Sequence, residues 1–337
     1  MGGDVMIGAW IEKWILILAL ALAGIAAPLK QLPIERLPYA DEMEEAARIQ
    51  QRAGELIKAE KLRRGIELAE EDVWEIGIMG PHFTAITTTS GGAAEKRTCQ
   101  LPDFAALCVK YFHEAGLQPG DRVGANFSGS YPGLNLAAIC AAEAMGLELV
   151  YSTSVGSSTY GANCPGYTFP EMLKTLVDAG LISRMPGMIT LGGGGDMGRN
   201  MAGYELEDDE WIAEIEDMKA RLVAEGLAYE TNIESYAQDI AIHEALYGDV
   251  KAFVNAGGNG LGLGHNDGVI LEVGSGLLEP QAVEVNEHSG FVERYLAKGI
   301  PVIHLLNVHA LCEEGIPFDP VRPPEIGTSP VYYGGWQ

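Results

Sequence analysis

Short apolar runs alternate with helical patterns along most of the chain, and this alternation restricts the folds that are open to it. The runs that we predict to be strands are 122–127, 148–152, 188–191, 250–255, 269–273 and 301–307. The patterns that we predict to be helices are 102–115, 134–145, 169–179, 208–224, 233–247 and 288–297. Short strands separated by helices are typical of a mostly parallel sheet with helices on both faces. We therefore predict an α/β fold that is Rossmann-like and three-layered.

The loops after the strands are where such a fold would carry a site. Right-handed crossovers bring the C-terminal ends of parallel strands, and the loops that follow them, to one edge of the sheet. Ligands of open α/β sheets bind in the crevice at this edge. The 43 glycines of the chain gather after the apolar runs, which favours tight loops there over a flexible linker.

The loop after the first strand reads Ser128-Gly129-Ser130 and leads into a helix that begins near Pro132 and carries Asn135. Free N–H groups at a helix start, with hydroxyls beside them, suit a carboxylate or a phosphate. The alternative is that one of the serines simply caps the helix. Both interpretations remain open at this point.

The loop after the second strand is dense in hydroxyl side chains and contains Ser154, Ser157 and Asn163. Because it follows the neighbouring run in the chain, we expect it to lie beside the first loop at the same edge of the sheet. Two adjacent polar loops that contain glycine indicate a site better than either loop alone.

The third and fourth loops add further polar candidates. Residues 193–198 match GxGxxG, but an irregular acidic stretch follows, so a tight turn that presents Asp196 is favoured over a dinucleotide site. Asn255 and Asn259 follow the strand 250–255 as neutral hydrogen-bond donors.

Whether the chain is an enzyme stays open. Ser128, Ser130 and Ser154 are candidate nucleophiles, and His304 is a candidate base. The alternative for His304 is a core histidine, since it lies in an apolar run. The sequence contains neither a GxSxG nucleophile elbow nor a GxxxxGK[ST] phosphate loop.

We predict no metal and no cofactor. The five cysteines form no CxxC pair, which argues against a zinc motif or a disulfide scaffold. His243-Glu244 begins like HExxH, but Tyr247 stands where the second histidine is needed. The formal charge of −25 disfavours nucleic acid and any polyanion spread over a wide face, so a bound anion needs a local site.

The N-terminus carries an apolar run, 14–27, which ends at Pro28. We predict an uncleaved single-pass membrane anchor over 1–28, with a cleaved signal peptide or a buried helix as alternatives. A charged helical linker, 29–72, either lifts the domain from the membrane or packs along its side, with a partner-binding coiled coil as the alternative to a solvated helix. The α/β domain then covers 73–337, with 204–247 as a candidate helical insert.

Several collinear motifs resemble the poly-gamma-glutamate system protein family. They are residues 79–89, 96–98, 120–138, 154–169 and 303–320. The resemblance covers nearly the whole chain, anchor included, but the segment 99–103 departs from the family's more polar form. It implies a membrane component that works with the subunits that make or export poly-gamma-glutamate, and it implies no particular reaction.

We therefore expect an accessory protein that binds a carboxylate-bearing chain end or precursor, with Lys96 and Arg97 as counter-charges. The alternatives are an amide hydrolase or transferase that acts on the γ-glutamyl polymer, and a purely structural subunit. The expected partners are the synthase and export subunits and the membrane, not nucleic acid. The signal-like N-terminus favours an extracytoplasmic domain, although free cysteines favour a reducing side.

Overall fold

The computed structural model describes residues 35–265 and 274–334. The chain divides into two compact units, and the described part of the smaller one is an antiparallel pair of β1 (Glu35–Arg36) and β10 (Tyr333–Gly334). The larger unit spans Tyr39–Tyr332. The predicted anchor, 1–28, and the predicted strand 269–273 lie outside the described residues. Within the described residues, no helix combines the length and the apolar character that crossing a membrane requires.

The larger unit is built on a six-stranded sheet of order β6-β4-β3-β7-β9-β8. The strands are β3 (Arg122–Phe127), β4 (Glu148–Ser154), β6 (Met188–Thr190), β7 (Ala252–Ala256), β8 (Gly276–Leu278) and β9 (Val302–Leu305). All pairings are parallel except that β8 runs antiparallel to β9. The prediction of an α/β fold with a mostly parallel sheet is thereby confirmed.

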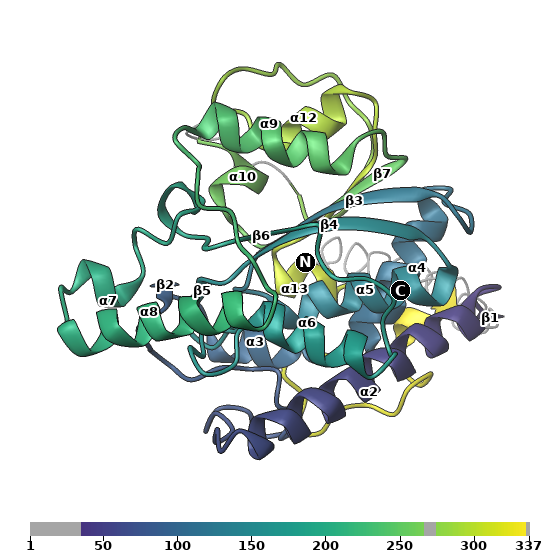
Figure 1. The fold of residues 1–337 in the computed structure, drawn as a ribbon. Coiled ribbons are helices and arrows are strands. Elements are labelled where there is room, and N and C mark those ends of the chain that lie inside the picture. The colour runs from purple at the N-terminus through teal and green to yellow at the C-terminus, as the bar shows by residue number, and fades with distance from the viewer. Residues whose placement is uncertain (1–34, 266–273, 335–337) are drawn as a thin grey trace, which may run out of the picture. The chain divides into compact units, whose positions relative to one another are not determined.

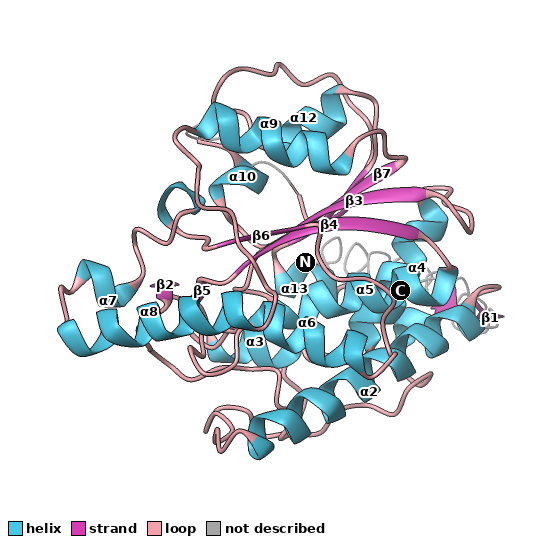
Figure 2. Cartoon of the chain, viewed as in Figure 1, coloured by secondary structure: helices cyan, strands magenta, loops and turns pink. Residues whose placement is uncertain are grey.

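Helices cover both faces of this sheet (Figures 1 and 2). One face carries α4 (Asp103–Glu114), α5 (Pro132–Met145) and α6 (Phe169–Asp178). The other face carries α9 (Tyr236–Tyr247), α10 (Gly260–Leu263) and α12 (Phe291–Ala297). On this second face, Tyr247, Phe253, Phe291 and Tyr295 form an aromatic cluster, with the rings of Phe253 and Tyr295 stacked at 4.0 Å.

The helix α2 (Ala40–Arg63) falls within the range 29–72 that was predicted to be a linker, but it is part of the larger unit. It packs against α4, α5 and α6. Its buried residues include Met43, Ala47, Ala53 and Ile57, which recur at helical spacing and form one apolar stripe. Of the predicted alternatives for this helix, packing along the side of the domain is the one observed.

The remaining elements are short, except for α8. They are β2 (Thr87–Thr89), α3 (Ala93–Thr98), β5 (Ser157–Ser158), the 3₁₀ turn η1 (Gly194–Asp196), α7 (Ala202–Glu205), α8 (Asp209–Ala224), α13 (Val308–Cys312) and the 3₁₀ turn η2 (Pro330–Tyr332). β2 and β5 pair in parallel. The candidate insert 204–247 divides between two places, because α8 packs with Met201 and Val155 while α9 lies on the sheet.

Replacing Asp103 by Asn is expected to stabilise the protein at neutral pH. The Asp103 carboxylate is buried at the start of α4, where the Ser329 hydroxyl is the nearby side-chain donor. Burial raises the pKa of this carboxyl. Because this pKa is higher in the folded protein than the value of about 4 in the unfolded chain, the folded state loses stability as pH rises above 4. The free energy of unfolding, measured with denaturant, should therefore be larger for Asp103→Asn than for wild type at pH 7, and the difference should disappear toward pH 4. Equal free energies at pH 7 would contradict this prediction.

Candidate functional site

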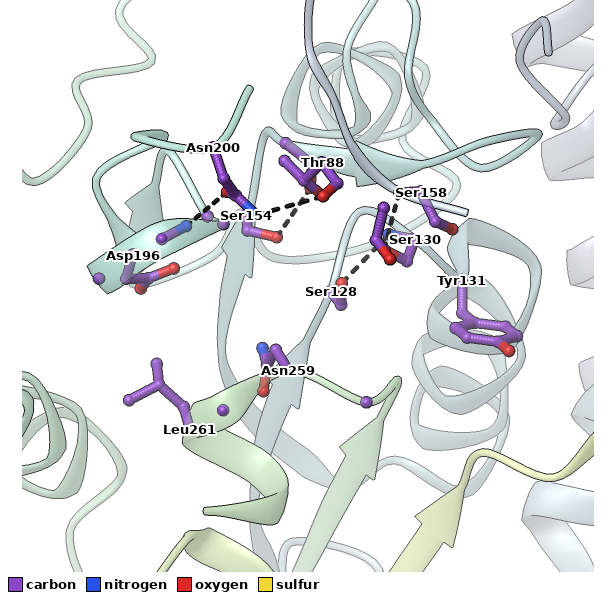
Figure 3. A pocket seen from close by; sticks show the side chains of 18 of the residues that line it. Thr88, Ser128, Ser130, Tyr131, Ser154, Ser158, Asp196, Asn200, Asn259 and Leu261 are labelled. Carbon is purple, nitrogen blue, oxygen red and sulfur yellow. Dashed lines mark hydrogen bonds between the residues drawn. The ribbon is translucent and has the colours of Figure 1, made fainter. Parts of the chain in front are cut away.

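The connections of the sheet create a crevice between β3 and β7. From β3 the chain builds β4 and β6 on one side, and it then returns to place β7 and β9 on the other side. The crevice at such a reversal is the usual ligand site of open α/β sheets. A pocket of about 490 Å³ lies there, lined by residues of the loops after β3, β4, β6 and β7 (Figure 3). The predicted loops therefore do meet at one edge.

Serine side chains hold the first two loops together. The Oγ atom of Ser154 accepts a hydrogen bond from Gly129 N at 3.0 Å, and Ser130 Oγ accepts one from Ser158 N at 3.0 Å. Ser157 Oγ donates to the carbonyl of Gly129 at 3.0 Å. A Cβ at Gly129 would lie 2.9 Å from the Ser154 carbonyl oxygen, so the approach of the two loops requires glycine.

Hydroxyl groups on this side of the pocket remain free to donate. Ser128 Oγ and Ser130 Oγ each accept from a backbone N–H, which leaves their own hydrogens for another acceptor. Ser158 is among the lining residues, and its Oγ is buried and has no hydrogen-bond partner among the described residues. Asn259 Oδ1 accepts from Gly262 N, so its amide hydrogens are also donors. The wall formed by these residues is rich in donors.

Lys96 brings a cation to the same wall. Its side chain lines the pocket, is 4% exposed, and donates to the carbonyl of Ser130. Its Nζ lies 3.3 Å from the centroid of the Tyr131 ring, a cation–π contact. Burial lowers the pKa of Lys96 to about 7, which an anionic neighbour would raise again.

A glycine turn presents Asp196 on another side of the pocket (Figure 3). Gly193 and Gly195 have φ values of 63° and 62°, and Asp196 itself has φ 56°, a backbone conformation that few other residues tolerate. The GxGxxG match is thus a tight 3₁₀ turn, followed by the four-residue helix α7. Burial and the nearby Asp239 carboxylate raise the pKa of Asp196 to about 7.

Asp239 and His243 of α9 complete this acidic side. The sequence prediction missed Asp239 and considered His243 only as the start of an incomplete HExxH motif. One ligand atom from each of Asp196, Asp239 and His243 lies within 4.8 Å of the others. His243 Nδ1 donates to the Asp239 carbonyl oxygen at 2.9 Å and lies 3.2 Å from Asp239 Oδ1. Burial opposes a charge on His243, but the two carboxylates raise its pKa above the ordinary value. The spacing of four residues on one helix face is the signal that could have found the pair.

Other predicted site residues lie behind the pocket wall. Asn135, Asn163 and Asn255 are fully buried and donate to backbone carbonyls of Ser128, Pro81 and Gly257 respectively. These amides hold the loops in place and are not among the lining residues. The helix start predicted as an anion site is also covered, because Gly133 packs against the Cys99 carbonyl, 2.3 Å from where a Cβ would stand.

Arg97 and His304 also point elsewhere. Arg97 forms a bidentate pair with Asp319 at 2.7 Å. His304 is buried in β9, and its Nδ1 accepts from Asn255 Nδ2 at 3.2 Å. Burial lowers the pKa of His304 to about 4. Neither side chain lines the pocket, so His304 is not placed to activate Ser128, Ser130 or Ser154.

The pocket therefore has a wall of hydroxyls and Lys96 and a separate acidic side formed by Asp196 and α9. Thr88 and Gly91, which come from the segment around β2, and His265 also line it. Comparisons of the chain with protein-family models, with curated proteins and with solved structures find no match.

Proposed function

We propose that the pocket binds a small ligand through its carboxylate, and that the protein acts as a membrane-anchored accessory of a poly-gamma-glutamate synthesis or export system. The observation that carries the ligand class is that Ser128, Ser130, Ser158 and the buried Lys96 all line one pocket. The γ-glutamyl identity of the ligand rests on the resemblance of the sequence motifs.

A carboxylate fits this wall better than a neutral group does. Hydrogen bonds from hydroxyls and an ammonium to a charged acceptor are roughly twice as strong as neutral ones. Lys96 is buried with a backbone carbonyl and an aromatic ring as its contacts, so an anion would offset the cost of keeping its charge out of water. A pocket of about 490 Å³ favours a chain end or a precursor, and the charge of −25 opposes wrapping a long polyanion.

The alternative of an amide hydrolase or transferase finds less support. The hydroxyl oxygens of the candidate nucleophiles Ser128, Ser130 and Ser154 accept from backbone amides. The candidate base His304 lies outside the pocket lining. This geometry favours hydrogen-bond donation to a ligand over serine nucleophilic attack.

Calorimetry with γ-glutamyl oligomers tests the proposed ligand class. Full-length protein in detergent should bind a γ-glutamyl dipeptide or tripeptide, and Ser128→Ala combined with Ser130→Ala should weaken that binding about 10-fold, because each lost hydrogen bond is worth about 0.5–1.5 kcal/mol. Ser183→Ala, in the exposed loop between α6 and β6, is the matched control and should leave the affinity unchanged. Absence of binding to wild type, or unaltered binding by the double variant, would refute the proposal.

A further inference from the structure

Two buried carboxylates, those of Asp196 and Asp239, lie close together on the acidic side of the pocket. Asp196 is 8% exposed and Asp239 is 2% exposed, and both line the pocket. Among the described residues, Asp196 Oδ2 has no hydrogen-bond partner, and Asp239 Oδ1 has the ion-pair contact with His243 Nδ1 at 3.2 Å. Buried carboxylates normally have partners, because leaving their charge unpaired away from water is costly. These oxygens therefore point to a positively charged group in the space between them.

His243 supplies a nitrogen ligand at the same point. Four residues after Asp239 on α9, it lies on the same helix face. The ligand atoms of the three residues lie within 4.8 Å of one another. Neighbouring ligands of a tetrahedral ion with bonds of about 2.1 Å are about 3.4 Å apart, so the three side chains would move inward to hold one ion.

We propose that Asp196, Asp239 and His243 bind a divalent transition-metal ion, Mn²⁺ or Zn²⁺, at the pocket wall. Carboxylates suit Mn²⁺ and imidazole suits Zn²⁺, whereas Mg²⁺ and Ca²⁺ prefer oxygen ligands throughout. Because Asp196 and Asp239 line the pocket, the remaining coordination positions of the ion face the space where a ligand would lie. The ion would neutralise both carboxylates and would occupy Asp196 Oδ2, which has no hydrogen-bond partner among the described residues.

The local backbone supports this assignment. Asp196 stands at φ 56° at the end of a glycine-rich turn, and Gly194 N is held by Asn200 Oδ1 at 2.6 Å. Non-glycine residues in this conformation gather at functional sites, where the surrounding structure maintains them. The turn fixes Asp196 opposite α9, which is the placement that a shared ion requires.

Metal titration of the full-length protein in detergent, stripped with a chelator, tests the site. Free Mn²⁺ is followed by electron paramagnetic resonance, and Zn²⁺ by competition with a chromophoric chelator. We expect one ion per chain, and Asp196→Asn or Asp239→Asn should each weaken binding by about 10-fold or more, at least the cost of losing a supporting residue around a metal site. Asp217→Asn, on the exposed side of α8, and His265→Ala, at the pocket but outside the cluster, are controls that should bind normally.

A spectroscopic measurement on the wild-type protein tests the site even if the variants fail to fold. Bound Mn²⁺ should show nitrogen coupling from an imidazole in pulsed resonance spectra, and His243→Gln should remove it. Lack of stoichiometric binding of either ion, or bound Mn²⁺ without nitrogen coupling, would overturn the proposal and leave a cluster neutralised by shared protons. The metal titration contains no γ-glutamyl ligand, so its result does not depend on the proposed function. Carboxylate binding measured with a chelator present contains no metal, so it tests only the serine wall.

Discussion

A Lys96→Met protein is expected to bind a carboxylate ligand about 10- to 100-fold more weakly than wild type. Methionine fills a similar volume but cannot donate a hydrogen bond, and a hydrogen bond to a charged group is worth about 1.5–3 kcal/mol. Lys96 lies in the pocket wall beside Tyr131 and Ser130. Calorimetry with a γ-glutamyl dipeptide measures the change directly.

The pH dependence of that binding shows whether the charge of Lys96, and not only its volume, contributes to the affinity. Burial lowers the pKa of Lys96 to about 7, so the free protein loses this charge as pH rises above 7. Glu95 opposes this shift through its charge, while burial raises the pKa of Cys99 and of Tyr131 and keeps both groups neutral. Affinity for a carboxylate should therefore fall by up to about 10-fold per pH unit above 7 in wild type.

The matched control is Lys174→Met on the exposed part of α6, where the lysine pairs with Asp178. It should retain both the affinity and the pH profile of wild type. The Lys96→Met protein should lose the pH profile as well as the affinity. A Lys96→Met protein that binds like wild type at pH 6.5 would show that this ammonium does not hold the ligand.

Replacing Glu171 by Ala is expected to lower the free energy of unfolding by about 3–5 kcal/mol, the usual effect of removing one partner of a buried ion pair. The Glu171 side chain has no exposed surface and lies 2.6 Å from Arg64 and 3.0 Å from Arg221. Its Oε2 also accepts from Thr168 N and Oγ1 at 2.8 Å, which caps α6. The single carboxylate thus links the end of α2, α6 and α8. Its loss takes a buried carboxylate from both arginines, and of the two Arg64 retains Glu60 at 2.8 Å.

Denaturant unfolding at several pH values checks this result. Burial alone would raise the pKa of Glu171, but hydrogen bonds from Arg221 and Thr168 lower it below the ordinary value. Its contribution is therefore complete above the unfolded pKa of about 4.3 and is lost as pH falls through the folded value. Glu225→Ala is the control: Glu225 lies 3.9 Å from Arg64 and is 30% exposed, so a change below about 1 kcal/mol is expected. Equal effects of the two substitutions would contradict the assigned role.

The sheet was the most predictable part of the fold. The observed β3 has the predicted bounds, because an apolar run with a glycine-containing loop at each end leaves little choice of register. α5 begins at Pro132, two positions before the predicted 134, since proline is well tolerated in the first helical turn. The pairing of β2 with β5 was not predictable, because short polar strands far apart in sequence carry no periodic signal.

The location of the candidate site could be predicted better than the identity of the side chains that line it. Ser128, Ser130, Ser154, Asp196, Asn259 and Lys96 line the pocket, as expected from loops that share one edge of the sheet. Asn135, Asn163 and Asn255 turn inward, because unpaired backbone carbonyls beside them need donors, a requirement visible only in three dimensions. Asp239 was missed for a related reason: its orientation depends on which face α9 packs against the sheet.

The edges of the sheet bear on how copies of this protein could associate. Both edge strands, β6 and β8, contain three residues each in the described chain. Such short strands expose few backbone groups and are poor templates for adding a strand from another molecule. Self-association through continuous sheets is therefore disfavoured, and any stable assembly would have to use side chains of the outer helices and loops as its contact surface.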